Sequence, residues 1–158
     1  MNVSVHNVTW YATASALGST EVISDALNWL TGGGADISQE KIKSYHGAKM
    51  ILLKAHIDRK KAAKQSISHL GAPLLKKLAE SDDLSKRIDD GNTLHIRLSI
   101  SSLVSGSIEL SEGSEEQVKG RIKLEVYPGQ DPLENARNML NKASDIAEKN
   151  GLPTNIHE

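Results

Sequence analysis

The 158-residue chain contains no cysteine and no phenylalanine, and aromatic residues make up only 3% of it. Without cysteine there can be no disulfide framework, no thiolate metal site and no cysteine nucleophile. Without phenylalanine the core must be built from aliphatic side chains, with Trp10 and Trp29 as its largest members. The chain is nevertheless long enough to bury a core within one domain.

Long apolar runs are also missing. The longest, Met50–Leu53, is far too short to cross a bilayer. The first ten residues lack the charged segment and the apolar segment of a signal peptide. Charged residues make up 25% of the chain, as is usual for soluble globular proteins. These observations predict a soluble, cytoplasmic protein that does not associate with a membrane.

Sequence motifs for chemistry are equally scarce. Gly32–Gly34 lacks the Lys-Ser/Thr that a phosphate-binding loop requires, and we expect it to end a helix. His46 and His56 lie ten residues apart among lysines, without the spacing of a metal site. No nucleophile elbow surrounds any serine. We therefore predict no metal, no cofactor and no enzymatic activity, although distant Ser, His and Asp residues could still assemble a site in space.

Charge is unevenly distributed along a chain whose net charge is −1. Between Lys41 and Lys64 there are eight Lys or Arg residues and one acid, Asp58. Residues 109–158 hold ten acids and six bases. A basic segment inside a near-neutral chain favours a polyanionic partner.

Apolar periodicity predicts an α+β fold in the order β-α-β-β-α-β-β-β-α. Residues Thr31–Ser38 read as a loop, and Asp58 is expected to cap the second helix. Short connections imply a mostly antiparallel sheet with helices packed on one face. Residues 1–149 form the predicted single domain, and residues 150–158 a flexible tail. The expected strands cover residues 3–15, 41–46, 49–57, 94–101, 104–110 and 118–126; the expected helices cover 20–31, 60–70, 74–80 and 131–149.

Outward-facing positions of the predicted strands are rich in cations. Lys and Arg neutralise phosphates, while Tyr and His rings can stack on unpaired bases. The same rows would also arise if the charges only kept the strands soluble. The residues predicted to bind RNA are Lys43, Tyr45, His46, Lys49, Lys54, Lys60, Lys61, Lys64, Arg97, Lys119, Arg121 and Lys123.

Two motifs carry a resemblance to a known family. The first is a hairpin with Tyr45, His46 and Gly47, followed by an apolar strand and a basic helix up to Lys64. The second fits the form L-x-L-R-L-D-K-Q-A-A-x-x-G, with Ser-Ile-Ser in place of Asp-Lys-Gln. Its matching residues are Leu94, Arg97, Leu98 and Gly106. Over residues 3–147 the chain resembles an archaeal family of small RNA-binding proteins, often described as predicted exosome subunits.

The resemblance implies a fold like that of the large-subunit ribosomal protein that binds 5S RNA. It also implies a non-enzymatic protein that contacts RNA phosphates and RNA shape and is linked to RNA processing or the exosome. The alternative is an interaction scaffold or homodimeric subunit without direct RNA binding, whose basic face meets an acidic protein surface. The expected partners are therefore RNA, an RNA-processing complex or a second copy of the chain.

Overall fold

The computed structural model of the chain describes residues 4–15, 20–43, 47, 49–113 and 116–153. Its strands are β1 (Ser4–Ser15), β2 (Asp36–Lys43), β3 (Lys49–Ile57), β4 (Thr93–Ser99) and β5 (Gln117–Glu125). Its α-helices are α1 (Thr20–Leu30), α2 (Lys60–Ile67), α3 (Ala72–Glu80), α4 (Ile100–Val104) and α5 (Pro132–Asn150). Two 3₁₀ turns are η1 (Ser68–Leu70) and η2 (Leu84–Arg87). No helix in these ranges is long and apolar enough to span a membrane.

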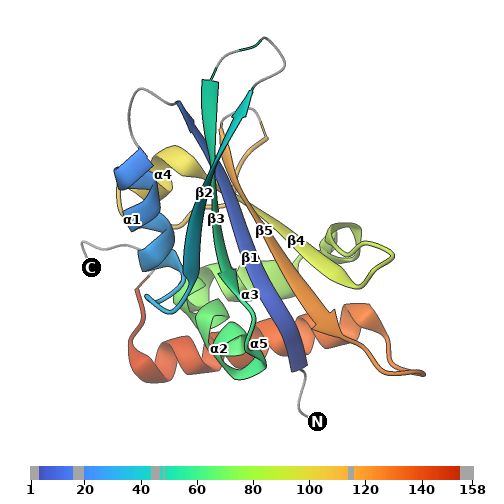
Figure 1. Ribbon diagram of the computed structural model, residues 1–158. Helices are drawn as coiled ribbons and strands as arrows, with labels where there is room; N and C mark the ends of the chain where they lie inside the picture. Colours follow the sequence, from blue (N-terminus) through green and yellow to red (C-terminus); the bar gives the residue numbers. More distant parts are fainter. Residues whose placement is uncertain (1–3, 16–19, 44–46, 48, 114–115, 154–158) are drawn as a thin grey trace.

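The five strands form one antiparallel sheet in the order β2-β3-β1-β5-β4. The N-terminal strand β1 is therefore central, between β3 and β5. The helices pack against one face of this sheet (Figure 1). This arrangement confirms the predicted α+β fold with antiparallel strands and helices on one face.

Strand periodicity determines which face the helices cover. In β4 the buried Leu94, Ile96 and Leu98 alternate with the more exposed His95 and Arg97. Apolar residues at alternate positions thus create a face that is stable only when covered. The same alternation in the neighbouring strands places these buried residues on the helix side: Val8, Trp10, Ala12, Leu53, Ala55, Val118, Ile122 and Leu124.

Trp10 packs closely against Gly120 in the core of the sheet. They lie opposite each other on β1 and β5, and Trp10 is only 3% exposed. A Cβ atom at position 120 would lie 2.3 Å from Cζ3 of the indole ring. The large ring fits on the helix side because its cross-strand neighbour has no side chain.

Helix α5 confirms the helix predicted over residues 131–149. Its first turn is capped by the Asp131 carboxylate, which accepts a hydrogen bond from the Leu133 N–H at 3.1 Å. Gly151 ends the helix in the left-handed conformation, with φ of 63°. The division into a domain and a tail after residue 149 stays a prediction. The predicted apolar stripe is buried at Ala136, Leu140, Ala143 and Ala147.

The strand predicted over residues 104–110 is wrong. Ser99 ends β4 and accepts a hydrogen bond from the Ser102 N–H at 3.3 Å, which starts helix α4. Ile100 and Leu103 are buried at the three-residue spacing of a helix. Leu110 makes only an isolated bridge to Leu98. The sheet of the described chain therefore has five strands where six were expected.

Two boundaries in the basic segment also differ from the prediction. Strand β2 begins at Asp36, inside the predicted loop, because residues 36–43 pair along the whole of β3. Residues 44–46 of the strand predicted there lie outside the described residues. The cap predicted at Asp58 is wrong: the N-cap of α2 is Arg59, without a side-chain hydrogen bond. The Asp58 carboxylate instead lies 3.8 Å from the His56 ring.

Candidate nucleic-acid interface

The sheet face opposite the helices, called the open face below, carries a row of cations across the strands. Cross-strand partners share a face, so the pairing registers define its members. The central row consists of Arg97, Lys119, Tyr11, Lys54 and Ser38, one from each strand. Three cations and one aromatic ring thus lie side by side without an acid among them.

The next row combines cations with imidazole rings. It consists of His95, Arg121, Thr9, His56 and Asp36. The Thr9 hydroxyl and His56 Nδ1 share a hydrogen bond of 2.7 Å, and Thr9 is only 5% exposed. This bond fixes the His56 ring against β1. Beyond this row, the Lys123 ammonium donates to the Gly91 carbonyl in the turn before β4.

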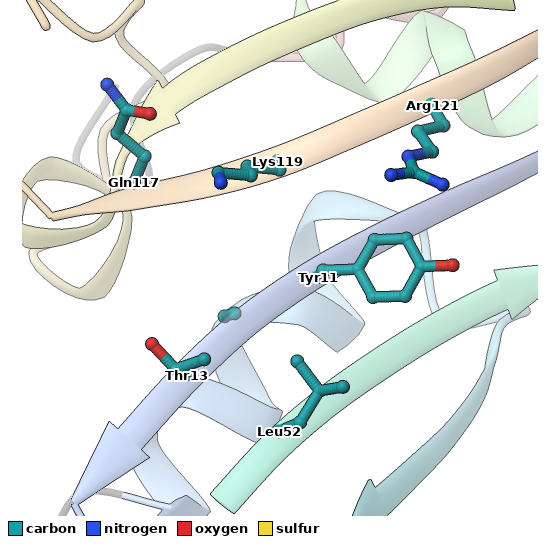
Figure 2. Close-up of a pocket in the computed structure, with 7 residues that line it drawn as sticks. Tyr11, Thr13, Leu52, Gln117, Lys119 and Arg121 are labelled. Carbon is teal, nitrogen blue, oxygen red and sulfur yellow. The ribbon is translucent and has the colours of Figure 1, made fainter. Parts of the chain in front are cut away.

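Tyr11 is the centre of the open face. The Lys54 Nζ lies 5.9 Å and the Arg121 Cζ 5.4 Å from the centroid of its ring. Both distances are within the range of cation–π attraction. The ring borders a depression of about 360 Å³ that Thr13, Leu52 and Lys119 also line (Figure 2). The open face therefore offers an aromatic surface beside positive charge.

The cations of the central row lack compensating acids. Arg97 and Lys119 are directly opposite on β4 and β5, and both are exposed. Neither side chain makes a hydrogen bond or ion pair with any part of the chain that the structure describes. Like charges in directly opposite positions destabilise a sheet. An anion bound between them would remove this repulsion.

Carboxylates are found at the margins of the open face. Asp89 Oδ2 lies 2.7 Å from His95 Nε2, and Glu125 Oε2 lies 2.8 Å from Lys60 Nζ. The hydrogen bond from His95 is the largest cause that lowers the pKa of Asp89, and backbone N–H groups of Thr93 and Gly91 add to it. Asp89 and Glu125 thus engage partners at the rim, and Asp36 and Glu40 lie on the edge strand β2, so the centre of the face is cationic.

Replacing His95 with alanine is expected to raise the pKa of Asp89, because the largest stabilising contact of the carboxylate disappears. A carboxyl group whose folded pKa is lowered stabilises the fold above its unfolded pKa. That stabilisation is lost as the pH falls through the folded pKa. The variant should therefore lose stability near neutral pH and match the wild type in strong acid.

Carboxyl NMR titration measures the pKa, and urea unfolding at several pH values measures the stability. His56→Ala is the control, since it removes an open-face imidazole that does not contact Asp89. An unchanged Asp89 pKa in His95→Ala would contradict the role given to this contact.

The structure brings only part of the predicted set together. Lys43 and Lys49 are opposite each other at the end of the β2–β3 hairpin, on the helix side of the sheet. Lys61 and Lys64 lie on α2 and Lys60 pairs with Glu125. Tyr45 and His46 lie outside the described residues. The predicted cations that share the open face are Lys54, Arg97, Lys119, Arg121 and Lys123.

Tyr11 was missed by the sequence-based prediction, although a signal was available. Val8, Trp10 and Ala12 have the alternation of a buried strand face, which places Tyr11 on the opposite face. The basic segment drew the prediction toward Tyr45 instead. No three His, Cys, Asp or Glu side chains of the described ranges lie close enough together to hold a metal ion.

An uncovered sheet face with an aromatic ring among cations is one way in which small α+β domains bind RNA. A family model described as RNA binding matches residues 7–126, which is well over half of the chain and includes most of β1 and the whole of the other four strands. The chain belongs to this RNA-binding family. No curated protein matches the chain.

Solved structures of archaeal proteins share the fold. Mth689, a DUF54 protein from Methanothermobacter thermautotrophicus, has a TM-score of 0.68 and 22% identity, covering 89% of this chain and 98% of its own. SSO0741 from Sulfolobus solfataricus, also DUF54, has a TM-score of 0.62 and 16% identity, covering 86% and 98%. A UPF0201 protein from Methanococcus jannaschii has a TM-score of 0.57 and 10% identity, covering 85% and 98%. At these identities the likeness concerns the fold alone.

Proposed function

We propose that the protein binds RNA through the open face of its sheet and carries out no chemistry on it. The observation that carries the proposal is the exposed Arg97–Lys119 pair, two cations directly opposite each other without a described acidic partner. Membership of the RNA-binding family supports RNA as the polyanion. Phosphate oxygens would fit between these cations and remove their mutual repulsion.

The other open-face cations extend the proposed contact. Lys54 and Arg121 are on either side of Tyr11, so a strand of RNA crossing the sheet would meet positive charge on β3, β5 and β4, with the Tyr11 ring of β1 between them. Lys123 continues this surface toward the turn at Gly91. The contacts would be with phosphates and with the shape of the RNA rather than with a long base sequence.

The remaining predicted residues belong to an outer zone of the proposal. Lys43 and Lys49 at the hairpin end, and Lys61 and Lys64 on α2, are exposed or half-exposed and could meet flanking phosphates of a longer RNA. Lys60 is engaged by Glu125 and would have to exchange that partner. The part played by Tyr45 and His46 stays a prediction.

The test is a salt series of RNA binding by three versions of the protein. The wild type should bind a mixed-sequence single-stranded RNA with an affinity that falls by about 0.7 logarithmic units, per logarithmic unit of salt, for each phosphate contacted. The variant Lys54/Lys119/Arg121→Gln should lose affinity. The slope of its logarithmic affinity against the logarithm of the salt concentration should be smaller in magnitude by about 2. The matched control Lys77/Lys86/Lys149→Gln removes three exposed charges elsewhere and should keep the wild-type slope.

Two results would count against the proposal. A wild type without saturable RNA binding at low salt would favour the alternative, a scaffold or homodimer whose basic face meets an acidic protein surface. Equal salt slopes for the two triple variants would show that the RNA does not bind to the open face. Light scattering of the same samples measures self-association and identifies the homodimer directly.

The resemblance to predicted exosome subunits adds further proposals. They are a place in an RNA-processing complex, a cytoplasmic location and a fold like the ribosomal protein that binds 5S RNA. Affinity capture of the chain, with and without ribonuclease, tests the first of them. A processing complex that remains after ribonuclease treatment would be held by protein contacts.

A further inference from the structure

We propose that Tyr11 is a stacking platform for one unpaired base, so that the open face selects single-stranded over duplex RNA. This inference rests on the proposed function and adds the form of RNA and the residue that recognises it. It follows from the position of the Tyr11 ring, the lining of the depression beside it and the charges around both.

The first observation concerns the ring itself. Tyr11 is half-exposed in the middle of the central strand, on the face that no helix covers. Its hydroxyl makes no hydrogen bond to the described part of the chain. Tyrosines with a structural role in a protein interior usually bury the ring and pair the hydroxyl. Tyr11 does neither, although the β1 residues around it are all buried: Val8, Thr9, Trp10 and Ala12.

The second observation is the depression beside the ring. Its volume of about 360 Å³ suits a single base with part of its sugar. Leu52 and the methyl group of Thr13 line one side, and Lys119 and Arg121 line the other (Figure 2). An apolar side next to a cationic side matches a nucleotide, which has an apolar base face at one end and a phosphate at the other.

The third observation is how the cations surround the ring. Lys119 is directly opposite Tyr11 on β5, and Lys54 is directly opposite on β3. Neighbouring strands are about 4.8 Å apart, so both ammonium groups are within reach of the phosphates on either side of a stacked base. Arg121, 5.4 Å from the ring centroid, can also stack its planar guanidinium against a base.

Duplex RNA does not suit this arrangement. In an A-form helix the base faces are stacked on one another, and a protein meets mainly the 2′-hydroxyl groups and phosphates of the shallow groove. A tyrosine ring that lies close to the sheet cannot enter the stack. A single strand presents free base faces, each of which an aromatic ring can accept without sequence preference.

The experiment compares three RNAs and four proteins. The first RNA is a fluorescein-labelled single strand of mixed sequence, the second has the same length and phosphates but abasic sugars, and the third is the first strand paired with its complement. The variants are Tyr11→Leu, which keeps apolar volume without the ring, and Tyr11→Phe, which keeps the ring. Tyr127→Leu is the matched control, since Tyr127 is 56% exposed, follows the end of β5 and donates its hydroxyl hydrogen bond to Glu125 at the margin of the open face.

We expect Tyr11→Leu to bind the single strand about 10- to 100-fold more weakly, whereas Tyr11→Phe and Tyr127→Leu bind like the wild type. The abasic RNA should bind the wild type and Tyr11→Leu equally weakly. The salt slope should stay the same in Tyr11→Leu, because no phosphate contact is removed. A 2-aminopurine in the strand should lose fluorescence on binding to the wild type and keep it with Tyr11→Leu.

The outcomes separate this inference from the proposed function. If the wild type binds abasic RNA as tightly as the normal strand, or duplex as tightly as single strand, the stacking role is overturned while RNA binding stands. Comparison of these RNAs on the wild type needs no variant, so a folding defect in Tyr11→Leu cannot obscure it. If the wild type binds none of the RNAs at low salt, both proposals are overturned.

Discussion

Replacing Gly120 with alanine is expected to lower the free energy of unfolding by about 1–3 kcal/mol, as is typical of an overpacked core. The new Cβ atom would lie 2.3 Å from Cζ3, 2.6 Å from Cε3 and 2.7 Å from Cη2 of Trp10. Carbon atoms attract each other best at about 3.5–4.0 Å, so these contacts are strongly repulsive. One of the two strands or the ring must move.

Neither movement is easy at this position. Trp10 is 3% exposed, and β1 and β5 are the central pair of the sheet, with partners on their other sides. The smaller conformational freedom of alanine in the unfolded chain offsets the loss by about 0.4–1 kcal/mol. The net effect on the free energy of unfolding should remain destabilising.

Urea unfolding followed by circular dichroism measures the change in midpoint. Gly34→Ala is the matched control, because a Cβ atom there has no neighbour within 4 Å. A double variant with Trp10→Leu isolates the contact: in that background, adding alanine at position 120 should cost little. A Gly120→Ala variant as stable as the wild type would show that the ring has space to shift.

Replacing Lys119 with glutamate is expected to lower the affinity for single-stranded RNA by about 100-fold while leaving the fold as stable or more so. In the free protein the new carboxylate would face Arg97 directly, and an opposite-charge pair contributes about 0.2–1 kcal/mol where a repulsive pair stood. In the complex it would repel the phosphate and occupy Arg97. Like charges brought together in an interface cost several kcal/mol.

A loss of RNA affinity without a loss of stability distinguishes this prediction from a folding defect. Thermal unfolding measures the stability and fluorescence anisotropy the affinity. Lys77→Glu, an exposed residue of α3, makes the same change in net charge and should alter neither. Raising the salt should bring Lys119→Glu closer to the wild type, since screening weakens the repulsion. An unchanged RNA affinity in Lys119→Glu would show that Lys119 does not contact the RNA.

The prediction from sequence succeeded where local periodicity determines structure. Strong alternation from Leu94 to Leu98 and from Val118 to Leu124 identified both strands and their outward cations. The false strand at residues 104–110 arose because isolated apolar residues were read as alternation. A buried Ile100 and Leu103, after a serine able to cap, was the helical signal there.

The assembly of the candidate site depends on contacts that no local pattern contains. Tyr11 meets Lys54 on one side and Lys119 and Arg121 on the other only because β1 is inserted between β3 and β5. Sequence alternation assigns Lys43 and Lys54 each to one of the two faces of its own strand. It does not say whether these two residues lie on the same face of the sheet or on opposite faces. That assignment requires the β2–β3 register, which pairs Lys43 with Lys49 and Ser38 with Lys54.

The central position of β1 also has a consequence for how the protein is made. Strand β1 pairs with β5, which lies about a hundred residues further along the chain, and such distant pairings are formed late and slowly in folding. A nascent chain that ends before Gln117 has Tyr11 and Lys54 but not Lys119 or Arg121. The proposed RNA-binding face is therefore expected to be completed only once β5 has been synthesised, after the other four strands.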